Sequence, residues 1–282
     1  MYSSTIGICL TFLVTVIGYF FLVADDPVAV IKKMAHGQSA KNFKLYFILI
    51  LATLGVNILE LLLENKFSFV TWDMTPYIQA LEGNFTAHLQ HFLANRLLTE
   101  ILTFMYVFAF PATVLVSLAY YNYRDDSKMM TAVLFAMLVN YLIAFPFYIF
   151  FPVHEVWHHS SQVRPLMHEV YRTFETGYRR FSGIDNCFPS LHTSISLSMA
   201  LLATSSPYKR LARLMQVSSG LIILATLYLG IHWLTDVIGG VFTAGVAVSL
   251  ATSWERAAEL AVRAAHKLRP TYQGLEESKK RV

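Results

Sequence analysis

The stretch CFPSLHTS, Cys187 to Ser194, and the stretch YLGIHWLTDVIGG, Tyr228 to Gly240, each interrupt a long apolar run of this chain. Each stretch places a histidine, His192 or His232, where an apolar helix meets a polar connection. Side chains that can hold an anion or fix a proton lie beside both histidines. The two stretches therefore predict a bundle of helices with one polar site, at which the two histidines face each other.

The composition favours a membrane protein. Of the 282 residues, 55% are hydrophobic and only 14% are charged, and the mean hydropathy is +0.49. Soluble domains carry about 25% charged residues, so this balance indicates a chain embedded in a bilayer. The two cysteines, Cys9 and Cys187, cannot form a disulfide framework and match no zinc-binding spacing.

Seven apolar segments are candidates for crossing the bilayer, for which a helix needs about 20 apolar residues. No basic residue precedes the first segment and no small-residue cleavage site follows it, so we expect a retained helix instead of a signal peptide. The predicted fold class is therefore all-α, a polytopic membrane protein with about seven transmembrane helices. The segments cover residues 4–23, 45–63, 97–120, 129–151, 188–205, 212–231 and 234–253.

The charges predict an orientation in the membrane. The net charge of +4 comes without a basic stripe interleaved with aromatic residues, so we expect no nucleic-acid partner. Sixteen basic residues fall on one side of the predicted spans and six on the other. By the positive-inside rule, the C-terminal tail is cytoplasmic and the connections 64–96 and 152–187 face outward with both histidines. We expect an integral protein of the plasma membrane with its active site on the non-cytoplasmic face.

The first polar stretch contains residues suited to binding an anion. Pro189 fits the first turn of a helix, because its missing N–H would have no partner there. The first backbone N–H groups of that helix favour an anion, to which Ser190 adds a hydroxyl donor and His192 an acid or base. Taken alone, this pattern fits equally well a plain helix start with a histidine that reaches the membrane surface.

The second polar stretch pairs a histidine with a carboxylate. His232 and Asp236 are four residues apart and so share one face of a helix. An aspartate that accepts the N–H of one ring nitrogen leaves the other nitrogen free as a nucleophile. A helix-capping pair is the simpler alternative. Two such arrangements at the same membrane face favour a catalytic site.

The residues FPSLH (188–192) and GIHWLTDVIGG (230–240) are similar to the second and third signature motifs of the type 2 phosphatidic acid phosphatase (PAP2) superfamily. This superfamily includes lipid phosphatases and vanadium haloperoxidases. The resemblance covers residues 129–253, with the two motif histidines 40 residues apart. It divides the chain into N-terminal transmembrane helices and an interfacial segment (1–128), a catalytic core (129–253) and a cytoplasmic basic tail (254–282).

The resemblance implies a role for each site residue. His232 would accept the phosphoryl group, Asp236 would orient it, and His192 would protonate the leaving oxygen and later activate water. Ser190 would bind phosphate. Phosphoryl transfer depends mainly on positioning and charge neutralisation, so we expect neither a metal nor another cofactor. The expected substrate is a membrane lipid that carries a phosphate ester.

The sequence departs from the family pattern at its cationic positions. Ala225 and Thr226 stand near where the third motif usually has Ser-Arg, and Trp157 stands where the first motif has lysine. The pattern Thr-x-Tyr-x-Gly-x-His that ends at His232 resembles the inositol-phosphorylceramide-synthase-like branch. Members of that branch transfer a phospho-headgroup to an alcohol, so a phosphatase and a phosphotransferase both remain open.

The missing positive charge needs a replacement, because a phosphate in a partly dry site requires cationic donors. Arginine is suited to bidentate phosphate contacts. Arg164, which precedes Pro165 as in the first motif, is the leading candidate. Arg179 and Arg180 are closer to Ser190 in sequence, and Arg172 also lies in the same connection.

Two other classes of protein have some support. The run His154-Glu155-Val156-Trp157-His158 matches the HExxH pattern of zinc proteases, for which Glu169 or Glu175 could supply a third ligand. A membrane transporter would explain ionisable groups within apolar segments. Those groups, Glu60 and Glu100 with the polar Asn140, are also explained by pairing or by reaching the membrane surface.

Overall fold

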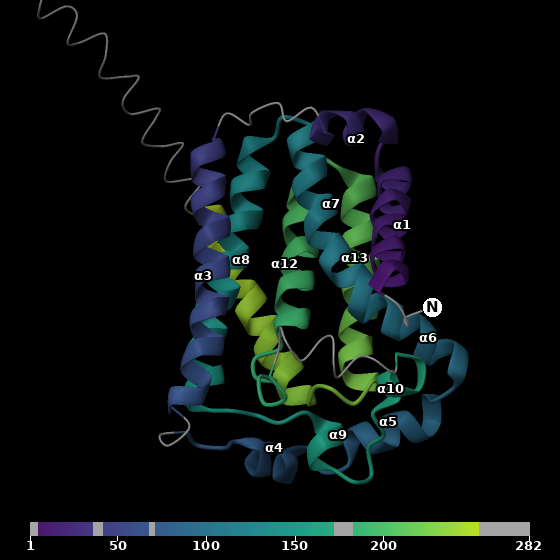
Figure 1. Cartoon of the computed structure of the whole chain (residues 1–282), viewed down its shortest axis with the longest axis vertical. Coiled ribbons are helices and arrows are strands. Elements are labelled where there is room, and N and C mark those ends of the chain that lie inside the picture. Colours follow the sequence, from purple (N-terminus) through teal and green to yellow (C-terminus); the bar gives the residue numbers. More distant parts are fainter. Residues whose placement is uncertain (1–4, 36–41, 68–70, 172–182, 254–282) are drawn as a thin grey trace, which may run out of the picture.

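The structure is a computed structural model that describes residues 5–35, 42–67, 71–171 and 183–253. Long helices run side by side, and short helices cross one end of the bundle (Figure 1). The described part contains no strand, as predicted for an all-α protein. The long helices are α1 (Thr5–Val23), α3 (Phe43–Phe67), α7 (Phe110–Tyr123), α8 (Ser127–Phe150), α12 (Leu191–Ser205), α13 (Lys209–Tyr228) and the final helix Leu234–Ser253. The short helices are α2 (Pro27–Ala35), α4 (Thr75–Glu82), α5 (Phe85–Leu93), α6 (Arg96–Phe104), α9 (Val156–His159) and α10 (Leu166–Val170).

All seven predicted apolar segments form helices. Among the described residues, five helices are long and apolar enough to cross a bilayer: Ile6–Val23, Arg96–Tyr123, Ser127–Phe150, Lys209–Tyr228 and Leu234–Ser253. The protein is therefore an integral membrane protein by length and composition.

α12 is shorter than the sequence predicted. It begins at Leu191 and has 15 residues, so it spans about 22 Å at 1.5 Å per residue. Such a length does not cross the hydrocarbon core of about 30 Å. Most of α12 is buried, and it packs on α13, α8 and α7. A helix enclosed by protein on several sides does not have to match the bilayer thickness.

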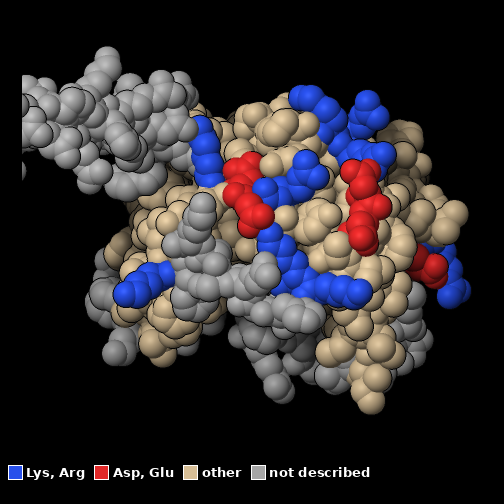
Figure 2. Space-filling model, turned by 90° about the horizontal axis from the view of Figure 1, so that it is seen from above, with Lys and Arg blue, Asp and Glu red and all other residues tan. Residues whose placement is uncertain are grey.

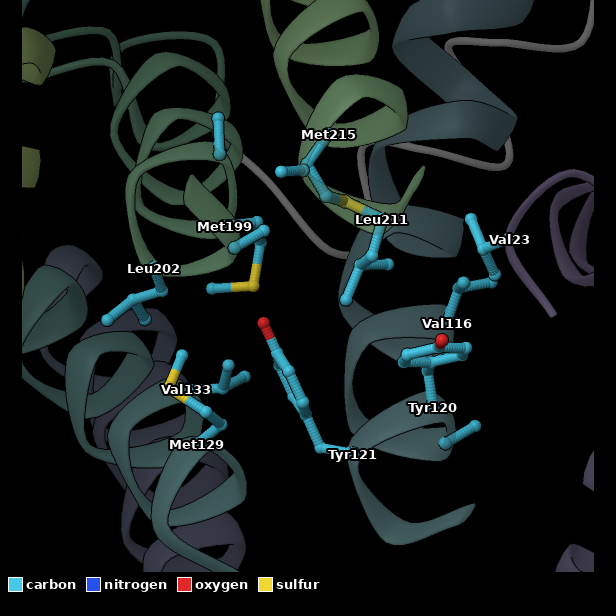
Figure 3. Close-up of a cluster of buried hydrophobic side chains, with 14 of the residues drawn as sticks. Val23, Val116, Tyr120, Tyr121, Met129, Val133, Met199, Leu202, Leu211 and Met215 are labelled. Atoms are coloured by element: carbon cyan, nitrogen blue, oxygen red, sulfur yellow. The ribbon is translucent and has the colours of Figure 1, made fainter. Parts of the chain in front are cut away.

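Small and apolar side chains bring these helices together. The largest hydrophobic cluster joins α1, α7, α8, α12 and α13, and its centre contains Tyr121, Met199 and Met215 (Figure 3). Ala132, Ala136 and other alanines of the same cluster are almost fully buried, which lets helix backbones approach closely. The cluster fixes the bundle at the end opposite the two histidines.

The connections sort to the two ends as the sequence predicted. The turns after α1, α7 and α12 meet at one end, where lysine and arginine side chains gather around a few carboxylates (Figures 1 and 2). Lys33 pairs with Asp125 at 2.8 Å, and Arg210 pairs with Asp25. The described parts of 64–96 and 152–187 lie at the opposite end with α4, α5, α9 and α10 (Figure 1).

The helical rod Arg96–Tyr123 is irregular at its centre. A π-helical turn, η1 (Met105–Ala109), separates α6 from α7. Pro111 follows this turn, and a proline inside an α-helix removes one hydrogen bond and collides with the carbonyl four residues earlier. The wider π turn accommodates that disruption. η1 lies beside α13 and turns Tyr106 and Phe110 toward α12.

Candidate active site

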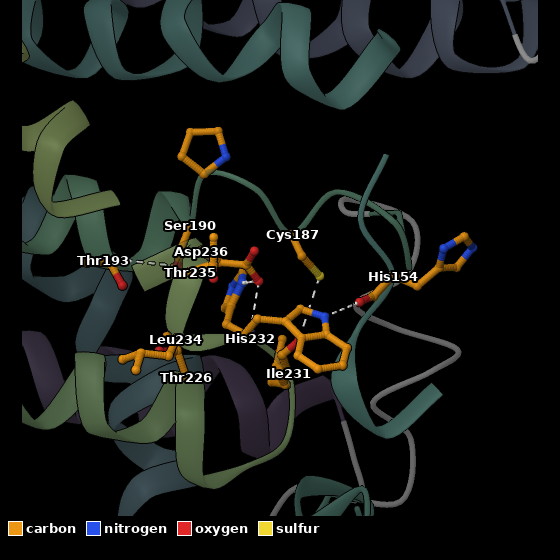
Figure 4. Close-up of polar contacts among 12 residues, drawn as sticks. His154, Cys187, Ser190, Thr193, Thr226, Ile231, His232, Leu234, Thr235 and Asp236 are labelled. Carbon is orange, nitrogen blue, oxygen red and sulfur yellow. Dashed lines mark hydrogen bonds and ion pairs between the residues drawn. The ribbon is translucent and has the colours of Figure 1, made fainter. Parts of the chain in front are cut away.

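The two polar stretches meet through backbone contacts. The Ser190 side chain caps α12 by accepting the Thr193 N–H at 3.3 Å (Figure 4). The Ser190 N–H donates to the Asp236 carbonyl oxygen at 3.1 Å, which ties the first stretch to the second. The Tyr148 hydroxyl of α8 donates to the Pro189 carbonyl oxygen at 2.9 Å. Pro189 therefore lies before the cap, instead of in the first turn of the helix as predicted.

Two glycines allow the final helix to approach α12 closely. A Cβ atom on Gly240 would lie 2.7 Å from the Ser190 carbonyl oxygen and 2.8 Å from the Thr193 Cβ. A Cβ atom on Gly239 would lie 2.6 Å from the ring of Phe188. All three distances are too short for a side chain, so these positions require glycine for the observed packing.

A tight turn delivers His232 from the end of α13. Gly230 has a φ of +81°, which favours glycine, and a Cβ atom there would lie 2.8 Å from Val163. The His232 N–H then donates to the Thr226 carbonyl oxygen at 3.0 Å. The turn therefore fixes the backbone on both sides of the histidine.

His232 and Asp236 form the predicted pair. The His232 Nδ1 lies 3.3 Å from the Asp236 Oδ2, and both side chains are buried (Figure 4). Oδ2 also accepts the Trp233 N–H at 2.9 Å. Asp236 Oδ1 is buried without a hydrogen-bond partner among the described residues. A carboxylate on Nδ1 leaves the Nε2 lone pair of His232 available as a nucleophile.

A second carboxylate supports this pair from a distant part of the chain. The Glu82 side chain of α4 accepts the N–H groups of Leu234 and Thr235, at the start of the final helix. A negative charge is favourable there because the first N–H groups of a helix have no partner within the helix. Glu82 therefore anchors the turn that holds His232, a role that no sequence pattern predicted.

The two histidines line one cavity of about 300 Å³. The ring centroids of His192 and His232 are 6.3 Å apart, with an angle of 53° between the planes. The cavity wall includes residues of α3, η1, α7, α8 and α12 and of the connections before α12 and after α13. The structure thus brings together His192, His232 and Asp236, which come from two separate stretches of the sequence.

A comparison with protein families gives one match. A family model described as the PAP2 superfamily matches residues 78–250. The chain belongs to the PAP2 superfamily. The superfamily comprises phosphatases and related phosphotransferases, so a phosphatase-type activity is supported at this level. A search of curated proteins and a search of solved structures gave no match.

The PAP2 match begins well before residue 129, where the sequence motifs placed the start of the catalytic core. Three contacts agree with an earlier start. Gln90 of α5 donates to the carbonyl oxygens of Arg164 and Tyr228, Glu82 holds the final helix, and η1 faces α12. Residues before 129 therefore contribute contacts to the site, and the division of the chain at residue 129 stays a prediction.

The cavity is acidic in its described part. No lysine or arginine among the described residues lines it, whereas Glu60 of α3 and Glu155 do. Trp157, which stands where the motif resemblance predicted a lysine, donates its ring N–H to Glu155. Asn186 donates to Glu60 at 2.8 Å and also lines the wall. Trp157 itself is not part of the cavity wall in the described residues, but it contacts the wall through Glu155.

The predicted phosphate ligands are not all at the cavity. Ser190 is fully buried as the cap of α12 and, in the described part, is absent from the cavity wall. The Arg164 side chain is exposed and pairs with Glu169 at 3.5 Å, away from the two histidines. Arg179, Arg180 and Arg172 lie outside the described residues, so their role stays a prediction.

The HExxH run does not form the helix that a zinc protease needs. α9 is one turn long and begins at Val156, so His154 precedes it. His154 instead contacts Thr75, the first residue of α4, and Asp73, just before that helix. Burial acts to raise the pKa of the Asp73 carboxyl, but the hydroxyl and N–H of Thr75 outweigh it and hold that pKa below its ordinary value.

One group of three metal-ligating side chains occurs in the described part of the chain. Cys187, His232 and Asp236 place a sulfur, a ring nitrogen and a carboxylate oxygen within 4.8 Å of one another. His154 and His158 do not belong to such a group there. A metal on His232 Nδ1 would compete with the His232–Asp236 contact, so the arrangement favours the pair without a metal.

Several residues of the site gave no clear signal in the sequence. Glu60 and Tyr106 lie within apolar segments, where pairing or packing explains them as well as function does. Only its position as an ionisable group within a predicted span pointed to Glu60, and its partner Asn186 lies 126 residues away.

Proposed function

We propose that the protein is an integral-membrane lipid phosphatase or phosphotransferase that cleaves a phosphate ester through a phosphohistidine. One observation carries the proposal. His232, oriented by Asp236, faces His192 across a cavity with 6.3 Å between the ring centroids. This arrangement supports a nucleophile and an acid on opposite sides of one phosphoryl group.

The first step transfers the phosphoryl group to the protein. The Nε2 lone pair of His232 attacks phosphorus, and the bond from phosphorus to the lipid oxygen breaks. His192 donates a proton to that oxygen, so the lipid leaves as a neutral alcohol. Asp236 stabilises the positive charge that develops on the His232 ring by accepting the Nδ1 hydrogen.

The second step returns His232 to its starting state. A water molecule or an alcohol attacks the phosphohistidine, and the neutral His192 takes the proton of the attacking oxygen. The bond from nitrogen to phosphorus then breaks and releases a phosphate or a new phosphate ester. No metal is needed for either step, because positioning and charge account for most of the catalysis of phosphoryl transfer.

The size of the cavity supports a lipid head group as its occupant. A volume of about 300 Å³ lies at the lower end of ligand sites, which run from about 300 to 1,000 Å³. The apolar side chains of α3 near the cavity, such as Leu54 and Ile58, are exposed in this structure. We infer that the head group enters sideways from the bilayer and that its chains stay among the lipids.

The proposed orientation follows the charges. The end of the bundle that carries Lys33, Lys128 and Arg210 would face the cytoplasm with the C-terminal tail. The cavity would then open to the non-cytoplasmic leaflet of the plasma membrane. Labelling of single cysteines introduced at the two ends of the bundle in intact cells tests this orientation.

The test of function uses purified protein and a panel of lipid phosphates: phosphatidate, isoprenoid phosphate and diphosphate, and a phospholipid with an esterified head group. We expect release of phosphate that vanadate inhibits and that a chelator leaves intact. His232→Ala should abolish the release, whereas His88→Ala, which changes a histidine of α5 outside the cavity wall, should not. Turnover that survives in His232→Ala would refute the mechanism.

A second candidate is transfer of a head group to an alcohol, as in the inositol-phosphorylceramide-synthase-like branch. The acidic wall of Glu60 and Glu155 favours it, because a phosphodiester carries one negative charge and a dianionic monoester carries two. Inositol or a lipid alcohol is added to the same panel. A new phosphodiester identifies a transferase, and free phosphate alone identifies a phosphatase.

A further inference from the structure

His192 lies against two aromatic rings that come from the rod Arg96–Tyr123. The Tyr106 ring stacks on it with 3.9 Å between centroids and an angle of 15°. The Phe110 ring lies 4.2 Å away at an angle of 37°. Both rings line the cavity that contains His192 and His232. Tyr106 and Phe110 are called the aromatic pair below.

The π turn explains why both rings reach the histidine. Pro111 prevents a regular α-helix in this part of the rod, and the chain forms η1 instead. The Phe110 N–H closes this turn by donating to the Met105 carbonyl oxygen. π turns are rare in proteins and occur often at functional sites. The aromatic pair thus stands on a backbone feature that ordinary helix packing does not require.

The contact has two physical consequences for His192. The face of an aromatic ring carries partial negative charge, so it stabilises a protonated imidazole in surroundings that otherwise disfavour a charge. Stacking also fixes the plane of the imidazole and hence the direction of its N–H bonds. Neither effect takes the proton away from His192, because the face of an aromatic ring does not accept a proton from the imidazole.

We propose that the aromatic pair positions His192 as the proton donor to the leaving oxygen. The proposal rests on the proposed function, in which His192 donates that proton as the phosphorus–oxygen bond breaks. Tyr106 and Phe110 touch His192 and not the reacting atoms in this role, so they are positioning residues. The contribution comes from the ring faces and does not require the Tyr106 hydroxyl.

The dependence on the leaving group separates this role from plain packing. An alkoxide needs a proton as it leaves phosphorus, whereas p-nitrophenolate leaves without one. A variant that misplaces the acid therefore slows the first step with an alkyl ester and spares that step with the p-nitrophenyl ester of the same phosphate. The second step, in which His192 acts as a base, is common to both esters, so the comparison uses kcat/KM, which covers the reaction only up to release of the alcohol or phenol. A variant that only loosens the cavity or the fold loses both activities together.

The experiment compares Tyr106→Leu and Tyr106→Phe on these two esters in purified protein. General acids contribute about 10²–10⁴-fold, so we expect Tyr106→Leu to lose about 10- to 100-fold in kcat/KM on the alkyl ester. Its loss on the p-nitrophenyl ester should be smaller by at least about tenfold, because that ester does not use the acid. Tyr106→Phe keeps the ring and should behave like the unchanged protein on both.

Two more variants complete the design. Phe110→Leu should repeat the pattern of Tyr106→Leu more weakly, since its ring is tilted against the imidazole. Phe108→Leu is the matched control: Phe108 belongs to the same π turn, is buried, and packs beside Phe104. Phe108→Leu should show no difference between the two esters. Melting temperatures of all variants report on folding.

The outcomes separate a failure of the proposal for the aromatic pair from a failure of the proposed function. Equal losses on both esters in Tyr106→Leu and Phe110→Leu, or a Tyr106→Phe variant as poor as Tyr106→Leu, would overturn the positioning role. Both of these results count against the pair only when His192→Ala itself discriminates between the two esters. If His192→Ala treats both esters alike, the proposed function fails at its acid, and the proposal for the aromatic pair fails with it.

Discussion

His232 and His192 are the same type of residue and line the same cavity, but their surroundings differ. Asp236 and a fixed backbone turn hold His232 through hydrogen bonds. Two aromatic rings lie against His192. The elements differ as well: His232 follows the turn at Gly230, whereas His192 lies in the first turn of α12.

The difference indicates how one fold gives two histidines different tasks. A carboxylate on one ring nitrogen fixes the tautomer, which a nucleophile needs in every turnover. Aromatic faces fix the plane of a ring and leave its proton free to move, which suits an acid that later acts as a base. The four predictions that follow test this contrast, from the largest expected effect to the smallest.

The first prediction concerns the histidines themselves. His232→Ala should lose at least about 10³-fold in kcat on alkyl and p-nitrophenyl esters alike, because both need the nucleophile. His192→Ala should lose about 10²–10⁴-fold in kcat/KM on the alkyl ester and far less in kcat/KM on the p-nitrophenyl ester, because kcat/KM excludes the second step, in which His192 acts as a base with both esters. Steady-state kinetics with the two esters measures this. Identical patterns in the two variants would remove the basis of the comparison.

The second prediction concerns the tautomer of His232. Asp236→Asn keeps the shape of the side chain and removes its charge, so we expect a loss of about 10²–10⁴-fold in kcat on both esters. Trapping of the phosphohistidine with labelled substrate should show correspondingly less protein label. The control is Asp25→Asn, an exposed carboxylate paired with Arg210 at the other end of the bundle. A fully active Asp236→Asn would show that the carboxylate does not orient His232.

The third prediction concerns the packing that brings the two histidines together. Gly240→Ala forces a Cβ atom into the Ser190 carbonyl oxygen and Thr193, so we expect a destabilisation of about 1–3 kcal/mol. A shift of about 1 Å at the start of α12 can also lower kcat by about 10²-fold. Gly245→Ala on the same helix meets no atom within 4 Å and serves as the control. Thermal unfolding and kcat that match between the two variants would contradict the close-approach argument.

The fourth prediction concerns Glu82, which anchors the backbone just after His232 and has no such role for His192. Glu82→Gln removes a negative charge from the start of the final helix, so the free energy of unfolding should fall by about 0.3–1 kcal/mol. Glu100→Gln breaks only an exposed pair with Arg96 and should change it less. Melting curves in detergent measure both. A larger effect in Glu100→Gln would speak against Glu82 as the anchor.

Local sequence patterns were sufficient for the helices and for the core of the site. Hydropathy identified the long helices because a bilayer requires about 20 apolar residues in each spanning segment. The spacing from His232 to Asp236 predicted their contact, which the structure shows at 3.3 Å. The distribution of lysine and arginine predicted which connections share an end. Each of these signals comes from residues close together in the sequence, or from counting charged residues in separate short segments.

Other features depended on contacts between distant segments. Arg164 was favoured by its motif, yet it pairs with Glu169 and lies away from the histidines, because the turn at Gly230 packs against the backbone of its loop. Glu60 was explained as a residue near a membrane surface, yet it lines the cavity beside Asn186. No spacing along the chain predicts a contact over 126 residues.

The sequence by itself determined that this is an all-α membrane protein of the PAP2 type, and its motifs pointed to His192, His232 and Asp236. Only the tertiary structure decided the surroundings of each histidine. The π turn before Pro111 places Tyr106 on His192, and the paired glycines bring α12 against the final helix. The physical reason is that hydropathy and motif spacing act within one segment, whereas stacking, close approach and a shared cavity arise only where separate helices meet.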